Sequence, residues 1–422
     1  MRKYFGTDGI RRIANTELSP DLVYRVAKAG AYVLSKHTDK APTILIGRDT
    51  RLSGTLIESA MVAGFLSYGA NVKLLGVMPT PAVAYLTRKL QADASVVISA
   101  SHNTFEFNGI KYFSNKGMKI LDEIEEEIEE VMDSGKLDEL SAVSEKIGVS
   151  EIRTDLLDEY VYFFRKNFDD NIERFNRPDF KVAIDTANGA TYEVADKVFT
   201  TLGINHVILN NNPDGININA GCGSTHLEML KEYVVKNKMS LGIAYDGDGD
   251  RCLAVDENGE EIDGDKLLAI IGNYLRGKGQ LAKDTIVATV MSNLGLNKYA
   301  GKNKLQLIQT KVGDRYVLEE MLKNGYNLGG EQSGHVILLD YNPTGDGILT
   351  SLMLIQAILE SGKKASELSG LMQKYPQVLI NAKVSTDKKY EYEKNPEIKS
   401  AIERLEKQFS GNGRVLIRPS GT

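Results

Sequence analysis

The chain has 422 residues, and because a single hydrophobic core stops growing at roughly 250–300 residues, this length predicts three or four domains. The net charge of −6 and the lack of basic stripes argue against a nucleic-acid partner, although locally placed Arg and Lys can still bind an anionic ligand. No apolar stretch reaches the roughly 18 residues of a membrane span, the first residues lack a signal-peptide core, and Cys222 and Cys252 form no disulfide framework, so we predict a cytoplasmic protein without a membrane partner.

The first domain is predicted over residues 1–150. Helical spacing of apolar residues indicates helices over 53–68 and 121–131, and short apolar runs between them indicate strands. The predicted strands are 43–46, 71–75 and 94–98. This alternation is typical of a parallel sheet with helices on both faces. The polar stretch 134–151 is typical of a linker.

The pattern restarts in a second α/β domain, predicted over 151–254. An apolar stripe over 156–164 indicates its first helix. Its predicted strands are 182–184, 207–209 and 241–244. Thr225 and Glu228 have the spacing of a capping box, which predicts the start of a helix that ends near Asn237.

A third α/β domain is predicted over 255–368, and a smaller C-terminal α+β domain over 369–422. Asn258-Gly259 indicates a hairpin. The predicted strands of the third domain are 286–290, 305–308 and 336–339. The C-terminal domain contributes a predicted helix and a predicted strand, 398–409 and 415–417. The fold class is therefore α/β, with three doubly wound mixed domains and a smaller fourth piece.

A cluster of polar residues follows the buried strand predicted at 94–98. It contains Ser99, Ser101, His102 and Asn103. In open parallel sheets the ligand crevice lies beyond the carboxyl ends of the strands, so chemistry is expected at such a cluster. A serine there can serve as a nucleophile or as a phosphate carrier, while Ser and Asn can equally form an ordinary turn.

The second cluster, Asp246-Gly-Asp248-Gly-Asp250-Arg251, follows another apolar strand. Three alternating carboxylates with intervening glycines suit a hard divalent cation such as Mg²⁺, since unpaired they would repel one another. A solvated acidic turn is the alternative. A calcium EF-hand is excluded because Arg251 stands where that loop needs glycine.

Three further segments carry polar groups suited to a phosphosugar. The loop 330–335 offers a carboxylate, a hydroxyl and an imidazole between glycines, and 418–422 combines an arginine with two hydroxyls and a glycine. The N-terminal segment 6–11 adds a hydroxyl, a carboxylate and a fixed cation. Together these segments supply a hydroxyl carrier, a metal site, a sugar-binding loop and an anion cradle, as phosphoryl transfer to and from a polyol requires.

At this point the sequence resembles the α-D-phosphohexomutases, through five motifs that span the chain in family order. The motifs are Gly6-Thr7-Asp8-Gly9-Ile10-Arg11, Ser99-Ala100-Ser101-His102-Asn103, Asp246 to Arg251, Gly330 to His335, and Arg418 to Thr422. The resemblance implies four domains around a central cleft. The Gly-Thr-Asp-Gly opening and Gln332 favour an amino-sugar substrate over the mannose and glucose phosphates of other members, which stay as alternatives. Such an activity would feed UDP-N-acetylglucosamine and cell-wall precursor synthesis.

The resemblance also implies roles for individual residues. Ser101 would carry the phosphoryl group, with a hexosamine 1,6-bisphosphate as intermediate and activator. The implied metal ligands for Mg²⁺ are Ser101, Asp246, Asp248 and Asp250. The other implied catalytic residues are Lys111, Arg11, His102 and His335. The implied substrate-binding residues are Glu331, Ser333, Arg251, Arg418, Ser420, Gly421 and Thr422.

Three positions depart from the family pattern. Arg12 stands where glycine is usual, and Thr104 replaces a proline after Ser-His-Asn, which removes a φ restraint from that loop. The sequence stops at Thr422 inside the phosphate motif, so the C-terminal domain is expected to be incomplete here. A homodimer is common for the family. A non-catalytic sugar-phosphate sensor is kept as a different class of function, whereas a P-loop kinase is excluded because its Gly-x-x-x-x-Gly-Lys-Ser/Thr pattern is missing.

Overall fold

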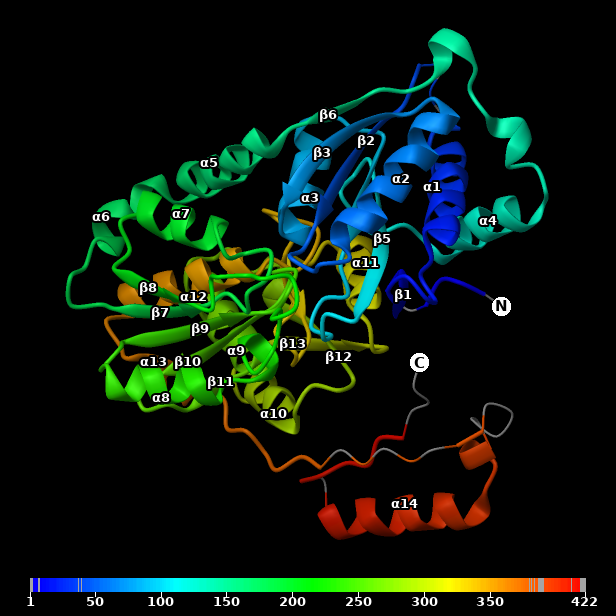
Figure 1. Ribbon diagram of the computed structural model, residues 1–422. Helices are drawn as coiled ribbons and strands as arrows, with labels where there is room; N and C mark the ends of the chain where they lie inside the picture. Colours follow the sequence, from blue (N-terminus) through cyan, green and yellow to red (C-terminus); the bar gives the residue numbers. More distant parts are fainter. Residues whose placement is uncertain are drawn as a thin grey trace.

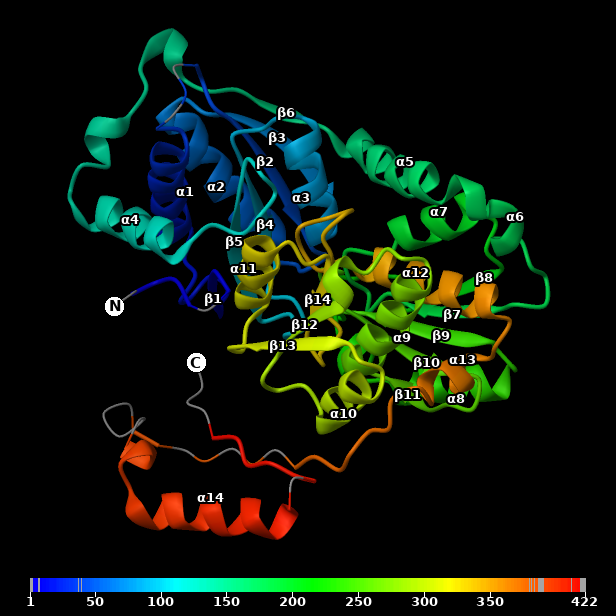
Figure 2. The same ribbon diagram turned by 180° about the vertical axis from the view of Figure 1, so that it is seen from behind.

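The computed structural model describes residues 3–6, 8–36, 38, 40–378, 380, 382, 384–385, 391–410 and 412–417. Three sheets with helices packed around them make up the body of the molecule (Figure 1). The last segment, which contains α14 (Pro396–Phe409), lies beside α10 and below the sheets in both views (Figures 1 and 2). Three α/β units and a fourth, different piece agree with the predicted fold class.

The first sheet has six strands in the order β1-β5-β4-β2-β3-β6. These are β1 (Ile10–Ile13), β2 (Thr43–Arg48), β3 (Asn71–Val77), β4 (Ala94–Ile98), β5 (Phe107–Ser114) and β6 (Ser150–Ile152). β2, β3, β4 and β6 are parallel, β5 pairs antiparallel with β4, and β1 at the edge pairs antiparallel with β5. The helices are α1 (Pro20–Leu34), α2 (Gly54–Tyr68), α3 (Thr80–Lys89) and α4 (Asp122–Asp133). Ile44 and Ile46 pack with α1 and α2 while Leu45 packs with α3, so both faces of this sheet are buried.

The second sheet has the order β11-β10-β9-β7-β8. Its strands are β7 (Val182–Asp185), β8 (His206–Leu209), β9 (Leu241–Tyr245), β10 (Cys252–Asp256) and β11 (Glu261–Ile262). The helices are α5 (Leu157–Phe168), α6 (Ile172–Phe175), α7 (Val194–Thr201) and α8 (Glu228–Lys236). The hairpin predicted at Asn258-Gly259 is confirmed, because β10 and β11 pair antiparallel. The capping box predicted at Thr225 and Glu228 is wrong, since Leu227 is the N-cap of α8 and Thr225 ends a separate 3₁₀ turn.

The third sheet has the order β13-β12-β14-β15. Its strands are β12 (Thr285–Thr289), β13 (Gln306–Thr310), β14 (Leu328–Gly330) and β15 (Val336–Leu338). The helices are α9 (Gly264–Gly277), α10 (Leu294–Lys302), α11 (Asp314–Asn324), α12 (Gly347–Ser361) and α13 (Ala365–Ser369). Asp346 caps α12 by accepting a hydrogen bond from the Leu349 N–H at 3.0 Å, which is the usual role of an N-cap carboxylate.

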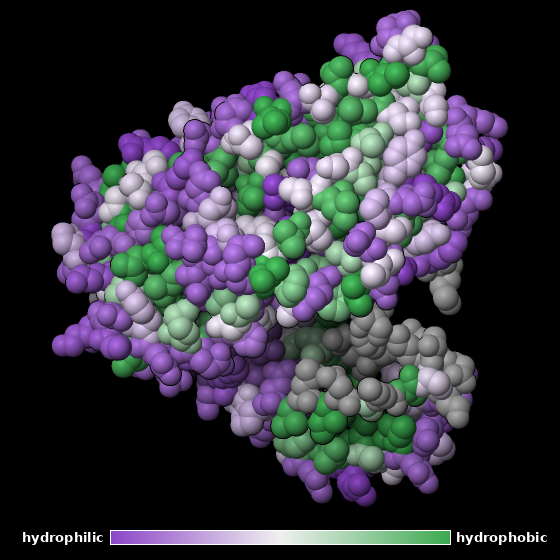
Figure 3. Space-filling view, in the orientation of Figure 1, coloured by the Kyte–Doolittle hydropathy of each residue, from purple (hydrophilic) through white to green (hydrophobic). Residues whose placement is uncertain are grey.

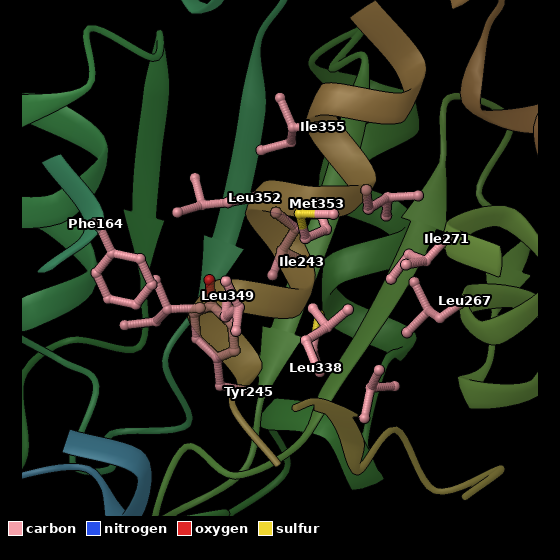
Figure 4. Packing of buried hydrophobic residues seen from close by; sticks show 14 of the residues in the cluster. Phe164, Ile243, Tyr245, Leu267, Ile271, Leu338, Leu349, Leu352, Met353 and Ile355 are labelled. Atoms are coloured by element: carbon pink, nitrogen blue, oxygen red, sulfur yellow. The ribbon is translucent and has the colours of Figure 1, made fainter. Parts of the chain in front are cut away.

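Helix α12 joins the second and third units into one core. Its Leu349 lies next to Tyr245 of β9, its Leu352 points to the side on which Phe164 of α5 lies, and its Met353 lies toward Ile271 of α9 (Figure 4). The same cluster of buried side chains continues into α3 and β3 of the first unit. Burial on this scale stabilises the arrangement by roughly 25 cal/mol for each Å² of apolar surface removed from water. The three units therefore hold one another in place around the strand ends.

The C-terminal segment has helix α14 but no strand in the part that the structure describes. The strand predicted at 415–417 is therefore wrong. A strand needs a partner for its backbone N–H and C=O groups, and none is formed among the described residues there. Apolar atoms gather over this segment in the space-filling view (Figure 3), and Leu405 and Phe409 are partly exposed. Within the described ranges, none of the helices is both long and apolar enough to cross a membrane.

Candidate active site

The loop after β4, residues 99–104 and called the serine loop below, presents Ser101 to the second unit. Ser101 is only 1% exposed and has a left-handed φ of 53°. Its Oγ donates a hydrogen bond to Asp246 Oδ2 at 2.6 Å and lies 3.3 Å from His102 Nδ1. The predicted hydroxyl carrier and the predicted acidic loop are therefore in direct contact.

The loop after β9, residues 246–251 and called the metal loop below, gathers three buried carboxylates. One oxygen each from Asp246, Asp248 and Asp250 lies within 4.8 Å of the others. Burial raises the pKa of Asp246 well above its usual value, and its two acidic neighbours add to that rise. Asp248 Oδ1 and Asp250 Oδ1 are buried and find no hydrogen-bond partner among the described residues. Buried, unsatisfied carboxylate oxygens in one cluster fit a hard divalent cation.

The serine loop and the metal loop touch through their backbones. A Cβ at Gly247 would lie 2.5 Å from the carbonyl oxygen of Ser101, so only glycine fits there without a shift. Asn219 of the second unit donates hydrogen bonds to the carbonyls of Ser101 and Asn103, both at 2.9 Å. The glycine between the first two carboxylates therefore permits the close approach on which the Ser101–Asp246 contact depends.

Lys111 brings a buried cation to the metal loop. It is 2% exposed, and its Nζ donates to Asp248 Oδ2 at 2.8 Å and lies 3.7 Å from Asp250 Oδ2. Burial alone would lower the pKa of Lys111, but the nearby carboxylates, led by those of Asp248 and Asp8, outweigh burial and raise it. The lysine is therefore charged, and it is a buried site group rather than a solvated surface residue.

A second set of charges lies behind Lys111. Asp8 pairs with Arg11 and with Lys119, and Lys119 Nζ also donates to Asp314 Oδ2 at 2.6 Å. The chain of alternating charges links the N-terminal segment, the loop after β5 and the start of α11, which belong to two different units. Neither Lys119 nor Asp314 was predicted as a site residue, because each stands outside the five motifs. The two side chains meet only because the first unit packs on the third.

The two histidines differ in their surroundings. His335 Nδ1 lies 3.6 Å from Asp250 Oδ2 and its Nε2 accepts a hydrogen bond from the Gly345 N–H at 3.0 Å. Burial would lower the pKa of His335, but the carboxylates of Asp314 and Asp250 raise it. For His102, burial first and then Arg251 and Arg11 lower the pKa to about 4, so this ring is neutral at physiological pH.

The sugar-binding loop predicted at 330–335 lies next to the metal loop. Cys252 N–H donates to the Gly334 carbonyl at 3.0 Å, which ties the two loops together. Glu331 Oε1 accepts from the Gly313 N–H at 3.1 Å. Ser333 Oγ and Arg251 Nε are buried without a hydrogen-bond partner among the described residues. These unsatisfied groups can serve a polar ligand that enters beside the carboxylates.

The remaining predicted residues fall into two groups. Thr7 and the predicted phosphate cradle, Arg418, Ser420, Gly421 and Thr422, lie outside the described residues. Two of the three departures from the family pattern, Arg12 and Thr104, lie among the described residues. Arg12 donates to the Lys3 carbonyl at 2.9 Å, and the Thr104 carbonyl accepts a hydrogen bond from Arg51.

A cavity of about 360 Å³ lies beside His335, between the loop after β5 and helix α11. Its walls are largely apolar and include Ile124, Leu318 and Leu322, and Ser101 and the three aspartates do not line it. His335, Lys119 and Asp314 also line this cavity, so it adjoins the charged groups of the site, while the serine loop and the metal loop lie outside it.

Comparison with known proteins places these features in one family. Four domain families described as phosphoglucomutase/phosphomannomutase match in chain order: alpha/beta/alpha domain I over residues 2–139, domain II over 158–259, domain III over 263–375 and the C-terminal domain over 379–422. A phosphoglucosamine mutase from Ruminiclostridium cellulolyticum is 53% identical over 422 residues, which cover 100% of this chain and 93% of that protein.

Solved structures share the fold. A phosphoglucomutase/phosphomannomutase family protein from Burkholderia thailandensis superposes with a TM-score of 0.75 at 24% identity, covering 90% of this chain and 81% of that one. The N-acetylphosphoglucosamine mutase of Aspergillus fumigatus, solved with GlcNAc-6P and magnesium, gives a TM-score of 0.66 at 16% identity and covers 100% of this chain and 90% of that one.

Proposed function

Because the chain belongs to the phosphoglucomutase/phosphomannomutase family, we propose that it interconverts glucosamine 6-phosphate and glucosamine 1-phosphate through a phosphoryl group carried on Ser101. It is an enzyme of the isomerase class that moves a phosphoryl group within its substrate. The observation that carries the proposal is the 2.6 Å contact between Ser101 Oγ and Asp246, in a buried cluster of three carboxylates.

The reaction needs two transfers in sequence. In the first, the bond between Ser101 Oγ and phosphorus breaks while a bond forms from phosphorus to the free hydroxyl at C1 or C6 of the sugar phosphate. The hydroxyl proton leaves to a basic group of the site, and Ser101 Oγ regains a proton. The hexosamine 1,6-bisphosphate then turns around and returns its other phosphoryl group to Ser101 by the reverse steps. Little covalent chemistry is required of the protein, so positioning and charge account for most of the catalysis.

The residues of the site supply that charge. Asp246, Asp248 and Asp250, with an oxygen on Ser101, would hold Mg²⁺, which neutralises charge on the passing phosphoryl group. Lys111 is a charged donor beside the same carboxylates. His335, held between two carboxylates and the Gly345 N–H, would exchange a proton at the reacting hydroxyl together with Arg11 and Lys111.

Substrate recognition falls to the sugar loop and the C-terminal segment. Glu331, Ser333 and Arg251 would bind sugar hydroxyls and phosphate, and the unsatisfied polar atoms of Ser333 and Arg251 support this role. Arg418 to Thr422 would hold the phosphate that is not reacting. Since the intermediate turns around, that cradle must accept either phosphate, which suits arginine and backbone donors.

Replacement of Ser101 by alanine tests the carrier role. We expect Ser101→Ala to take up no phosphate from a labelled bisphosphate and to lose turnover, because the hydroxyl that carries the phosphoryl group is removed. Intact mass with phosphosite mapping checks both proteins. Ser59→Ala, at an exposed position on α2, should keep label and activity. A fully active Ser101→Ala enzyme would rule the mechanism out.

The choice of sugar is tested separately. The ratio of kcat/KM for glucosamine phosphates to that for glucose and mannose phosphates should favour the amino sugar. A preference for mannose or glucose phosphates would leave the carrier mechanism intact and move the enzyme to another branch of the family. Saturable sugar-phosphate binding by the phosphorylated protein with no isomer exchange would instead indicate a sensor.

A further inference from the structure

Arg51 is buried beside the serine loop, although it belongs to none of the five motifs. Its side chain is 0% exposed, and its Nε donates to Asp49 Oδ2 at 2.8 Å. Its two terminal nitrogens donate to three carbonyl oxygens of the serine loop, at Ser101, Asn103 and Thr104. A guanidinium without water is tolerated only when it is paired and hydrogen-bonded. Arg51 meets that requirement entirely through Asp49 and the backbone around Ser101.

The same carbonyls are held from the opposite direction by Asn219. Its side-chain N–H₂ donates to Ser101 and Asn103, each at 2.9 Å, and Gly247 closes the remaining side of the Ser101 carbonyl. Arg51 comes from the first unit and Asn219 from the second. The carbonyl of the carrier residue is therefore fixed by two amide- or guanidinium-type donors from different parts of the chain.

The peptide group that precedes the Ser101 Cα is also held by Arg51, through a chain of hydrogen bonds. Arg51 pairs with Asp49, Asp49 Oδ2 accepts from Ser99 Oγ at 2.6 Å, and Ser99 Oγ accepts from the Ser101 N–H at 2.9 Å. Both peptide groups that flank the Ser101 Cα are thus restrained. A non-glycine residue with φ near +53° costs about 1–3 kcal/mol and persists only where its surroundings determine it.

The chemistry of the guanidinium explains why arginine suits this position. Three carbonyl oxygens converge on one side chain here. They are best bonded by a planar group whose several N–H donors point in fixed directions, and the ammonium group of lysine is not planar. Thr104 leaves the loop without the φ restraint of a proline, and Arg51 bonds the Thr104 carbonyl directly. Hydrogen bonds from Arg51 therefore supply rigidity that the backbone itself does not provide.

We propose that Arg51 is a positioning residue for phosphoryl transfer, which holds the serine loop so that Ser101 Oγ faces Asp246. The inference rests on the proposed function, because it gives that contact its catalytic purpose. Arg51 touches neither the substrate nor the transferred group, and it acts through the direction of the Ser101 side chain.

Arg51→Lys in the full-length protein tests the inference. The lysine keeps a positive charge, but its three N–H donors cannot bond Asp49 and the three carbonyls together. We expect kcat to fall about 100-fold, as for an error of about 1 Å in the placement of a reacting atom, with KM for the sugar phosphate changed less than about threefold. Single-turnover transfer of labelled phosphate from Ser101 to the sugar should slow by the same factor. Backbone amides of the serine loop should exchange hydrogen faster.

Arg88→Lys is the matched control. Arg88 is also an interdomain arginine, and it donates to the Tyr341 carbonyl and to Asn342 Oδ1, neither of which belongs to the serine loop. This variant should keep kcat, transfer rate and serine-loop exchange. If Arg51→Lys does not fold, Asn219→Ala decides the question, since it removes two bonds to the same carbonyls. It should slow transfer in the same direction.

Separate outcomes count against the inference and against the proposed function. Unchanged kcat in Arg51→Lys, a rise in KM alone, or unchanged hydrogen exchange in the serine loop would overturn the positioning role. A wild-type protein that carries no phosphate on Ser101 and exchanges no isomers would overturn the proposed function instead. The exchange measurement does not depend on activity, so it still decides whether Arg51 holds the loop.

Discussion

At the scale of single residues, the three aspartates are arranged against their own electrostatics. Their oxygens lie within 4.8 Å of one another in a buried loop, and each such pair repels by on the order of 3–4 kcal/mol at an effective dielectric constant of about 20. Lys111 and His335 offset part of this repulsion. The cluster therefore lowers the stability of the folded protein until a cation binds.

Asp246→Asn tests this reasoning. In metal-free buffer we expect the variant to melt a few degrees higher than the wild type, because burial and two acidic neighbours disfavour the charged form of Asp246 and a neutral amide avoids that cost. It should also lose the increase in melting temperature that Mg²⁺ gives the wild type. Thermal unfolding with and without Mg²⁺ measures both effects. Asp170→Asn, at an exposed position, should behave as the wild type. A Mg²⁺ response retained in Asp246→Asn would contradict the assignment of this ligand.

Site residues that directly follow a predicted strand could be identified from the sequence. Those whose partners lie far along the chain could not. Ser101 and the aspartates follow buried strands, so their place at the sheet edge could be predicted. Lys119 and Arg51 have no such signal, since their partners come from segments far along the chain. An isolated arginine or lysine in a sequence is most often solvated, and only the fold shows that these two are not.

At the scale of elements, the junction of the serine loop with the metal loop is set by one glycine. A methyl group at Gly247 would lie 2.5 Å from the Ser101 carbonyl oxygen and 2.8 Å from Asn219 Nδ2. Both neighbours are held in place, the first as backbone and the second by its two hydrogen bonds.

We expect Gly247→Ala to lower kcat by about 100-fold, since the loops must move apart by a fraction of an ångström or more. It should also lower the free energy of unfolding by about 1–3 kcal/mol through overpacking. Gly301→Ala, in helix α10 with no atom within 4 Å of the new methyl group, should instead stabilise the protein by about 0.5–1 kcal/mol. Steady-state kinetics and chemical denaturation of both variants check this. An active Gly247→Ala enzyme would mean that the loops tolerate separation.

Elements with strong periodicity were predicted closely, and those that depend on partners were not. The strand predicted at 94–98 is β4, and the helix predicted at 53–68 is α2. The strand at 415–417 failed because a single apolar run cannot form a ladder alone. The capping box at Thr225 failed because Gly223 begins a tighter turn first, and α8 starts later than the box requires.

At the scale of the whole molecule, a buried polar junction ties the three α/β units together. Asn342 accepts from Arg88 and donates to the Pro81 carbonyl of the first unit, and it donates to Asp346 Oδ2 at 3.2 Å. Tyr160 of the second unit donates to the same oxygen at 2.8 Å. Burial raises the pKa of Asp346 to about 6, and its hydrogen bonds offset only part of that rise.

This shift makes stability depend on pH in a defined direction. Between about pH 4 and pH 6 the folded state binds a proton at Asp346 that the unfolded state has released, so this group's contribution is full at low pH and is lost as pH rises. Relative to Asp346→Asn, the wild type should lose about 2 kcal/mol between pH 4 and pH 7. Melting temperatures of both proteins across that range provide the check. Parallel pH profiles would show that Asp346 does not titrate in this window.

The way in which the second unit contacts the serine loop has a consequence for recombination among relatives. Asn219 and Gly247 contact only main-chain atoms of that loop, so they recognise its shape and not its side chains. At these two contacts, halves exchanged between homologues near residue 150 would meet without needing co-adapted substitutions. The junction around Asn342 depends on hydrogen bonds between side chains of all three units. Hybrid enzymes are therefore expected to lose stability there first.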